Sequence, residues 1–268
     1  MSAHDPAIAA LPLAGMHAVV TGGGRGIGFA VAERLGALGA SLSLLGRDRA
    51  KLYEAVQRLA GVAACDAHAC DVGDEASVQR AFEAIARAGH RVAILVNNAG
   101  TARSAKFTRT DSALWDEMLR VNLTGVYLCT RVALPVMLTL PAARVVNVAS
   151  TAALVGYPYV AAYCAAKHGV VGLTRSLALE LAATRVTVNA VCPGYTDTDL
   201  VRDAIANIVA RTGKSEADAR AAIASRNPQG RLVAPVEVAA TVAWLCLPDA
   251  SAITGQAIAV AGGEVTPG

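Results

Sequence analysis

Residues 17–28 have the sequence HAVVTGGGRGIG, and this stretch decides the fold. Residues 17–21 have the length and apolar content of a buried strand, and the apolar spacing of a helix begins near residue 26. Glycines between the two let the backbone turn sharply and approach a phosphate, whose charge then faces the amides and positive dipole end of the helix. Because a strand precedes the glycines and a helix follows them, a dinucleotide-phosphate loop is favoured over a plain flexible turn.

The rest of the chain repeats this alternation of strand and helix. Further short apolar runs occupy residues 41–45, 65–70, 92–97, 144–149, 185–191 and 256–261. Helical patterns lie near residues 26–38, 48–60, 74–88, 111–138, 158–182 and 235–247, each long enough for a right-handed crossover. The sequence predicts an α/β fold of Rossmann type, a doubly wound parallel sheet of seven strands with helices on both faces. Ligands of such sheets bind at the carboxyl ends of the strands.

Length and composition are those of one globular domain. The 268 residues are 54% hydrophobic and only 4% aromatic, enough for a single large aliphatic core. We expect residues 14–268 to form this domain and residues 1–13 to be a flexible N-terminus. The charge-free run 145–166 contains glycine, proline and several polar residues, so it is not expected to span a membrane.

Charge and cysteine content exclude several classes of partner. The net charge of +3 comes from 24 basic and 21 acidic residues spread along the chain, which does not indicate nucleic acid or an anionic membrane. Six cysteines lie in apolar surroundings without the spacing of metal ligands and are expected to be reduced and buried. The N-terminus has no pattern of a secretory signal, so a cytoplasmic location is expected.

Tyr163 and Lys167 stand four residues apart in the segment YCAAK. On a helix this spacing puts the phenol and the ammonium on one face, where they can share a ligand. Lowering a tyrosine pKa from about 10 to roughly 7 requires about 4 kcal/mol of preferential stabilisation of the phenolate, which an ammonium and a bound cationic ring can supply. The pair indicates a proton-transfer site. Taken alone, the pattern more often marks a half-buried tyrosine beside a lysine whose stem packs on apolar surface.

The glycine spacing TGxxxGxG at residues 21–28 resembles the classical short-chain dehydrogenase/reductase family. Four further segments match that family in order along the chain. They are Asn97-Asn98-Ala99-Gly100 after the fourth predicted strand, Asn122 in RVNLTG, Ser150 at the end of the fifth strand in NVAS, and Pro193-Gly194 after the sixth in NAVCPG. The resemblance spans residues 15–263 and implies an oxidoreductase that uses a nicotinamide dinucleotide to interconvert a ketone and a secondary alcohol.

The resemblance implies that Asn122, Ser150, Tyr163 and Lys167 form the catalytic set. Hydride transfer builds negative charge on the carbonyl oxygen, which needs a hydrogen-bond donor and then a proton. We expect Ser150 to be the donor and Tyr163 the general acid, or the base in the oxidative direction. The resemblance also implies that Lys167 holds the nicotinamide ribose and that Asn122 anchors a water linking Lys167 to solvent. Taken singly, Ser150 would be a helix cap and Asn122 a satisfied helix-interior amide.

The choice between the two nicotinamide cofactors is expected at the end of the second strand, where a carboxylate would bind the adenosine ribose. That position is Gly46, and the following Arg47 has the planar fork that suits a ribose phosphate. NADP(H) is therefore preferred, with Arg25 as a second cation, and NAD(H) remains possible. Asp48 would favour NAD(H) if the strand ended one residue later, and its alternative role is a helix N-cap.

The remaining cofactor contacts are implied by the resemblance. Asp71 is expected to accept a hydrogen bond from the adenine amine; it could equally cap the next helix, for which Asp74 is better placed. The residues after the fourth strand would pack under the ribose, and those after the sixth would border the nicotinamide and bind its carboxamide. No metal is required. The full set of predicted cofactor residues is Gly22, Gly24, Arg25, Gly26, Ile27, Gly28, Arg47, Asp71, Val72, Asn98, Ala99, Gly100, Tyr163, Lys167, Pro193, Gly194, Thr196 and Thr198.

Residues 196–231 resemble a lid over the substrate, with two short helices joined around Gly213. The basic residues of this lid could attract a phosphopantetheine or coenzyme A tail, although a solvated helix surface is the simpler interpretation. They are Arg202, Arg211, Lys214, Arg220 and Arg226. The predicted pocket walls are largely apolar and favour a hydrophobic carbonyl compound. They are Ala152, Leu154, Val155, Tyr157 and Tyr159.

The overall pattern is most similar to family branches that act on β-oxoacyl thioesters, including polyketide ketoreductases, and this is an analogy about substrate. Family members of this length are commonly homotetramers built from two long helices and the last strand. Two other functions on the same fold stay open. One is a dinucleotide-sensing binding protein without turnover, which would not need a tuned tyrosine, and the other is an epimerase or dehydratase.

Overall fold

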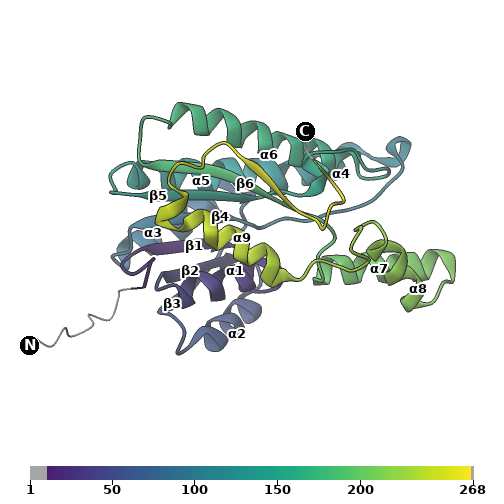
Figure 1. Ribbon diagram of the computed structural model, residues 1–268, viewed down its shortest axis with the longest axis horizontal. Coiled ribbons are helices and arrows are strands. Elements are labelled where there is room, and N and C mark those ends of the chain that lie inside the picture. The colour runs from purple at the N-terminus through teal and green to yellow at the C-terminus, as the bar shows by residue number, and fades with distance from the viewer. Residues whose placement is uncertain (1–10, 267–268) are drawn as a thin grey trace, which may run out of the picture.

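The computed structural model describes residues 11–266 and contains one seven-stranded, wholly parallel sheet in the order β3-β2-β1-β4-β5-β6-β7 (Figure 1). The strands are β1 His17–Thr21, β2 Ser41–Gly46, β3 Cys65–Ala69, β4 Val92–Asn97, β5 Ala143–Val148, β6 Val186–Pro193 and β7 Ala257–Val260. This confirms the predicted fold class, and each predicted strand matches within two residues. β1 lies between β2 and β4, so the chain reverses its winding direction there and opens a crevice at the carboxyl ends of the strands.

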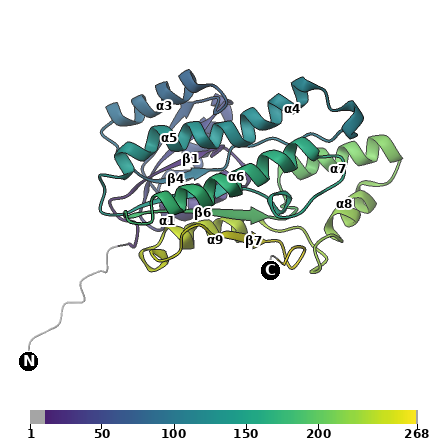
Figure 2. The same ribbon diagram turned by 90° about the horizontal axis from the view of Figure 1, so that it is seen from above.

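Helices cover both faces of the sheet, as Figure 2 shows. Their bounds are α1 Gly26–Ala37, α2 Arg49–Leu59, α3 Glu75–Arg87, α4 Ser112–Leu119, α5 Gly125–Met137, α6 Ala161–Glu180, α7 Asp199–Thr212, α8 Glu216–Ala224 and α9 Pro235–Cys246. Side chains of α1, α2 and α9 pack with one face of the strands into one apolar cluster. Those of α3, α5 and α6 pack with the opposite face into a second. This two-sided covering explains the continuous apolar runs of the strands.

The N-terminal boundary differs from the prediction. Residues 1–10 of the predicted flexible segment lie outside the described residues. Leu13 is fully buried in the cluster between α1 and the sheet, and its amide donates to the carbonyl of Leu38 at 2.9 Å. The packed domain was predicted to begin at residue 14, but Leu13 also belongs to it, because its side chain packs in this core cluster.

The predicted long helix over residues 111–138 is divided. Between α4 and α5 the backbone forms a π-helical segment, Arg120–Thr124, that contains Asn122. The Asn122 side chain donates to the carbonyl of Met118 at 3.0 Å, the acceptor that its own amide would use in an α-helix. This competition gives a physical reason for the local widening, and such π segments are frequent at functional sites.

The predicted lid contains α7 and α8, which project beyond the carboxyl ends of the strands in Figure 1. They are joined around Gly213, which ends α7 with a φ of 69°, as the sequence predicted. Among the described residues, no helix is long and apolar enough to cross a membrane.

Candidate active site

The glycine loop after β1 has the shape of a phosphate cradle. Gly22 and Gly26 have φ values of 64° and 54°, which residues with a side chain rarely adopt. A Cβ atom at Gly22 would lie 2.9 Å from Nδ2 of Asn98, and one at Gly28 would collide with the carbonyl of Gly22. The Arg25 side chain caps none of the amides in the first turn of α1. These amides at the positive end of the helix dipole fit a pyrophosphate.

The segment after β4 is fastened to this loop by Thr21 and Asn98. The Thr21 hydroxyl oxygen accepts hydrogen bonds from the amides of Asn98 and Ala99, both at 2.9 Å. In return, Nδ2 of Asn98 donates to the carbonyls of Thr21 at 2.9 Å and Gly22 at 3.3 Å. The two predicted cofactor segments thus form one rigid edge at the reversal point between β1 and β4.

Charged residues follow the end of β2, where the choice between the two nicotinamide cofactors was expected. β2 ends at Gly46, and Arg47 is exposed, with no ion pair among the residues that the structure describes. Asp48 is the N-cap of α2, where its carboxylate accepts from the amide of Lys51 at 3.2 Å. Arg25 is already paired, with Nη1 2.7 Å from Oδ2 of Asp199. Burial opposes ionisation of Asp199, but its bonds to Arg25 and Arg202 outweigh that effect and lower its pKa.

The sequence left open whether Asp71 or Asp74 caps the helix that follows β3, and the structure assigns the cap to Asp74. Asp74 caps α3 by accepting from the amide of Ala76 at 3.0 Å, so the cap does not need Asp71. Oδ1 of Asp71 accepts from the amide of Gly73 at 2.9 Å, and its Oδ2 lies 3.3 Å from Nη1 of Arg120. Asp71 therefore follows β3 with a fixed orientation, and its adenine contact stays a prediction.

Lys167 lies in α6 and is only 4% exposed. Its Nζ donates to the carbonyl of Val148 at 2.9 Å, at the end of β5, and lies 5.8 Å from the ring centre of Tyr163. A Cβ atom at Gly100 would lie 3.7 Å from this Nζ and 2.9 Å from Oδ1 of Asn122. The structure thus brings these predicted residues together where β4, β5 and α6 meet.

The Asn122 side chain is completely buried and bound to backbone groups. Its Nδ2 donates to the carbonyls of Thr101 at 2.9 Å and Met118 at 3.0 Å, and its Oδ1 accepts from the amide of Thr101 at 3.1 Å. The side chain therefore holds the segment after β4 against α4. The water that Asn122 is expected to anchor stays a prediction.

Burial dominates the acid–base properties of Tyr163 and Lys167. It raises the pKa of Tyr163 to about 12, while a hydrogen bond with the Ser150 side chain acts in the opposite direction. Burial also lowers the pKa of Lys167 to about 8. In the protein alone, the pKa of Tyr163 therefore moves opposite to the lowering expected with a cationic ring bound, and the phenol is protonated at neutral pH. The Ser150 hydroxyl also accepts from the amide of Ala152 at 3.1 Å, so it is a helix cap as well.

The segment after β6 runs from the sheet edge toward the glycine loop. The hydroxyl of Thr196 donates to the carbonyl of Gly194 at 3.0 Å, and that of Thr198 donates to the carbonyl of Thr196 at 3.2 Å. A Cβ atom at Gly26 would lie 3.3 Å from Cγ2 of Thr198. The beginning of the predicted lid and the glycine loop are therefore adjacent.

The predicted pocket walls lie in different environments. Ala152 is buried, Leu154 is half-buried against the cluster around α6, and Val155 is 39% exposed. Tyr159 is 62% exposed and has a positive φ of 70°. Tyr157 is half-buried and forms two hydrogen bonds. Of the two tyrosines, only Tyr157 is thus held firmly.

Sequence reasoning missed two polar residues beside this wall. Tyr195 packs edge-on to Tyr157 with ring centres 6.5 Å apart. Glu264 accepts a hydrogen bond from Tyr157 at 2.8 Å. A signal was present, because Tyr195 follows β6 and Glu264 follows β7, and ligands of parallel sheets bind beyond such strand ends.

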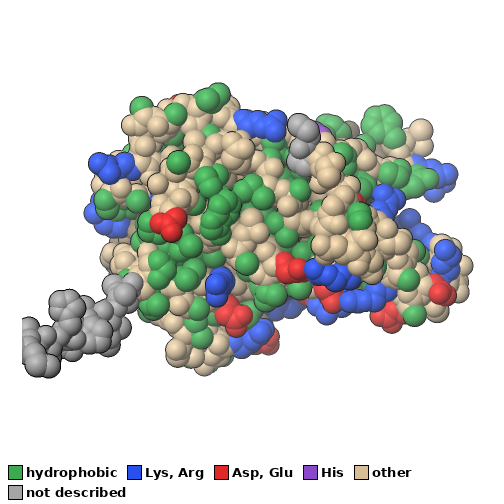
Figure 3. Space-filling view, viewed as in Figure 1, with side chains coloured by type: hydrophobic (Ala, Val, Ile, Leu, Met, Phe, Trp, Pro, Cys, Tyr) green, Lys and Arg blue, Asp and Glu red, His purple; other side chains and the backbone are tan. Residues whose placement is uncertain are grey.

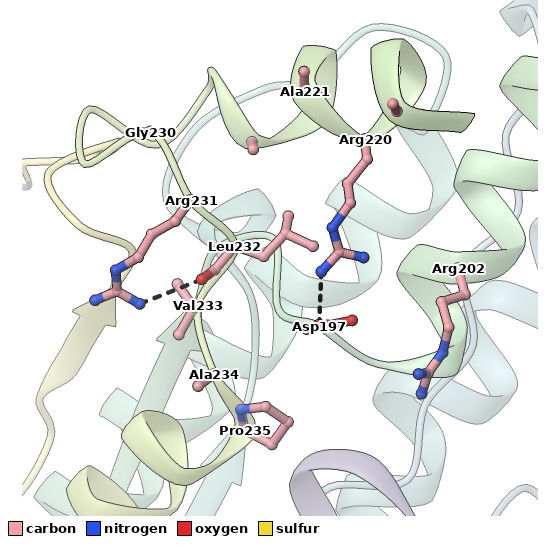
Figure 4. Close-up of a pocket in the computed structure, with 12 residues that line it drawn as sticks. Asp197, Arg202, Arg220, Ala221, Gly230, Arg231, Leu232, Val233, Ala234 and Pro235 are labelled. Atoms are coloured by element: carbon pink, nitrogen blue, oxygen red, sulfur yellow. Dashed lines mark hydrogen bonds and ion pairs between the residues drawn. The ribbon is translucent and has the colours of Figure 1, made fainter. Parts of the chain in front are cut away.

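Two of the five basic residues predicted on the lid, Arg202 and Arg220, form ion pairs with acidic residues. Nη2 of Arg202 lies 2.8 Å from Asp199, and Nη2 of Arg220 lies 2.7 Å from Asp197. Arg220 and Asp197 line a cavity of about 620 Å³ between α7, α8 and the start of α9, where Figure 4 shows them facing each other. This cavity contains none of the predicted catalytic residues. Arg226 instead lies over the Tyr157 ring, 5.6 Å from its centre.

A family model and curated relatives match this chain over nearly its whole length. A family model described as Enoyl-(Acyl carrier protein) reductase matches residues 22–264. A protein of Streptomyces violaceoruber named as ketoacyl reductase 1 of the granaticin polyketide synthase is 41% identical, with 96% of this chain and 94% of that protein covered. The 3-oxoacyl-[acyl-carrier-protein] reductase FabG of Aquifex aeolicus is 36% identical, with 94% and 98% covered.

A solved structure is also similar to this chain in both fold and sequence. The crystal structure of a single-residue variant of the actinorhodin polyketide ketoreductase with NADPH superimposes with a TM-score of 0.89 and 37% sequence identity. The match covers 93% of this chain and 97% of that one.

Proposed function

Because the chain belongs to the short-chain dehydrogenase/reductase family, we propose that it interconverts the ketone of a β-oxoacyl thioester and the corresponding secondary alcohol, with NADP(H) as cofactor. It is an NAD(P)-dependent oxidoreductase. The proposal rests on one observation above all: Tyr163, Lys167 and Asn122 lie close together beside the glycine loop that follows β1. The relatives named as ketoacyl and 3-oxoacyl reductases support the thioester class.

Each catalytic residue has a role that follows from its contacts. A bound nicotinamide cofactor supplies the hydride. Tyr163 is half-buried and protonated, so it holds the proton that the carbonyl oxygen needs as negative charge develops there. We expect the Ser150 hydroxyl, which follows β5, to donate a hydrogen bond to the same oxygen. Lys167 keeps an ammonium within 5.8 Å of the Tyr163 ring and stabilises the phenolate left behind.

The preference for NADP(H) rests on Arg47. It is the exposed cation at the end of β2 for which no ion pair is found in residues 11–266, whereas Asp48 is engaged at the N-terminus of α2. A guanidinium can bind a phosphate through two parallel hydrogen bonds. The NADPH in the related ketoreductase crystal structure supports this choice.

A homotetramer and a cytoplasmic location complete the proposal. β7 is an edge strand, and α9 exposes Val236 and Trp244, at 61% and 43%. Figure 3 shows apolar side chains on the face where α9 lies, while charged groups gather near the lid. Sedimentation at increasing protein concentration tests the tetramer.

The proposed cytoplasmic location is supported by the free cysteines, five of which are buried, because free thiols suit a reducing compartment.

A substrate screen tests the proposed function. The protein is mixed with NADPH or NADH and a β-oxoacyl thioester, an α,β-unsaturated acyl thioester or an aryl ketone, and nicotinamide absorbance and products are recorded. We expect NADPH consumption with the β-oxoacyl thioester and a β-hydroxyacyl product. Reduction of the unsaturated thioester alone would contradict the proposal and favour enoyl reduction. Turnover without any net change in nicotinamide absorbance would favour an epimerase or dehydratase instead.

A further inference from the structure

We propose that Glu264 is a specificity residue that selects acyl substrates bearing a hydroxyl group, by accepting a hydrogen bond from that hydroxyl at the wall of the substrate pocket. The inference rests on the proposed function, because it concerns which β-oxoacyl thioesters the same site prefers. It is carried by three observations: how the chain delivers Glu264 to the site, which groups hold the carboxylate, and which of its oxygens lacks a partner.

Two glycines direct the chain after β7 back across the carboxyl edge of the sheet. Gly262 and Gly263 have φ values of 59° and 92°. A Cβ atom at Gly262 would collide with the Asn227 side chain, and one at Gly263 would contact Pro228, so the segment is clamped against the end of the lid. This turn places Glu264 at the ligand edge of the sheet rather than leaving it in solvent.

A chain of hydroxyl groups fixes one carboxylate oxygen. The Tyr157 oxygen lies 2.8 Å from Oε1 of Glu264 and 2.9 Å from the hydroxyl of Thr151. A carboxylate can only accept, so the single proton of Tyr157 goes to Glu264 and the Thr151 hydroxyl donates to Tyr157. Burial raises the pKa of Tyr157, which keeps it a neutral donor. Thr151 is itself buried, so this arrangement is rigid.

The second carboxylate oxygen has no partner. Oε2 of Glu264 is buried and forms no hydrogen bond in the described part of the chain. It lies against Gly194, where a Cβ atom would come within 2.9 Å, so the glycine leaves room for it. Leaving a buried polar group unsatisfied costs about 1–3 kcal/mol, and more for a charged one. A ligand that brings a donor to this oxygen recovers that cost.

The neighbours of Glu264 belong to two segments of the predicted site. Gly194 directly follows β6, in the segment predicted to border the nicotinamide. Tyr195 packs on Tyr157, whose hydroxyl is hydrogen-bonded to Thr151, the residue directly after Ser150. The free oxygen thus lies against the segment that is predicted to border the nicotinamide, next to the expected site of the ketone. Its chemistry requires a donor, which on an acyl chain is most simply a hydroxyl.

A set of matched substrates tests the proposal. Three series of β-oxoacyl N-acetylcysteamine thioesters carry hydrogen, hydroxyl or methoxy at the end of the acyl chain, in several chain lengths. In the wild-type protein we expect kcat/KM for the best hydroxyl compound to exceed that of its methyl ether roughly ten- to hundredfold, since the ether cannot donate and leaves Oε2 unsatisfied. The unsubstituted thioester reports whether the proposed ketoreductase activity exists at all.

The isosteric variant Glu264→Gln separates this role from a structural one. Tyr157 would donate to the amide oxygen, and the amide nitrogen would then face the pocket and donate equally to a hydroxyl or an ether. The hydroxyl-to-methoxy ratio should fall toward one in Glu264→Gln, and also in Glu264→Leu. It should not change in Glu180→Gln, at the exposed far end of α6.

An equal ratio in wild type and Glu264→Gln, or a wild-type ratio of one, would overturn the inference while leaving the proposed function intact. Failure to reduce any of the thioesters would instead overturn the proposed function, and this inference with it.

Discussion

Lys167 is a buried ammonium, and burial of its charge lowers the stability of the folded protein. It is 4% exposed, and its Nζ donates a hydrogen bond to the carbonyl of Val148 at 2.9 Å. Removing a charge from water is costly, which is why burial lowers the pKa of Lys167 from 10.5 to about 8. In the proposed mechanism Tyr163 needs a cation nearby to leave its proton on the substrate, which accounts for the buried charge. Such residues exchange stability for activity.

Replacing Lys167 by Met should therefore stabilise the protein while abolishing turnover. The folded-state pKa lies below the unfolded one, so between about pH 8 and 10.5 the unfolded chain binds more protons and wild-type stability rises with pH. Below pH 8 the buried charge costs up to about 3 kcal/mol. In urea unfolding at pH 7 we expect Lys167→Met to be more stable by about 2 kcal/mol, since loss of the bond to Val148 offsets about 1 kcal/mol. A variant less stable than wild type at pH 7 would contradict this account.

Arg47 allows a second test at the level of one side chain. The Arg47→Ala variant should bind NADPH at least tenfold more weakly, because a charge-assisted bond to phosphate is worth roughly 1.5–3 kcal/mol. NADH lacks that phosphate and should bind about as before. Fluorescence titration of both cofactors measures the two affinities, and an equal loss for NADPH and NADH would rule out the phosphate contact.

At the scale of elements, a polar cluster joins β1, β2 and β3 at the edge opposite the active site. The His17 ring contacts the hydroxyls of Ser41 at 2.8 Å and Ser43 at 2.9 Å, and Ser43 also hydrogen-bonds to Asp66. The ring stacks on His90 with 4.1 Å between centres. Burial, and secondarily His90, lower the pKa of His17 from 6.5 to about 4. Neutral His17 thus fastens the three strands together.

Acid should loosen this cluster. Because the folded-state pKa of His17 is depressed, its contribution to stability is fully present above about pH 6.5 and is lost as pH falls through about 4. The loss is on the order of 3 kcal/mol. Urea unfolding of wild type and of the His17→Gln variant from pH 7 to pH 4 measures it. We expect a shallower pH dependence in the variant, and parallel curves would show that His17 does not titrate as described.

The elements themselves followed closely from local sequence patterns. Every predicted strand lies within two residues of the observed one, and the inner strands were recognisable because runs apolar on both faces suit the centre of a covered sheet. The division of the long helix at Arg120–Thr124 was not predicted, since it depends on the Asn122 side chain, which takes the carbonyl of Met118 and is also held by Thr101 in a different segment. Contacts of that kind have no local periodicity to reveal them.

At the scale of the whole molecule, the parallel sheet brings distant segments to one edge. The glycine loop, the segment after β4 and the end of β6 could be placed there from sequence, because each follows a strand. Glu264 and Tyr195 also follow strands, yet neither matches a motif, and their pairing with Tyr157 depends on how the C-terminal segment turns at Gly262. The direction of the Tyr163 pKa in the protein alone was likewise hidden, because it depends on the depth of burial.

Proton transfer by Tyr163 is proposed at a site assembled from β4, β5 and α6, beside a separate cofactor cradle at β1. The most direct measurement combines NADPH titration with steady-state kinetics on a β-oxoacyl thioester for wild type and Tyr163→Phe. We predict that the variant binds NADPH within about threefold of wild type, because the cradle is intact, while kcat falls by roughly a hundred- to ten-thousandfold. Turnover by Tyr163→Phe at the wild-type rate would contradict the account.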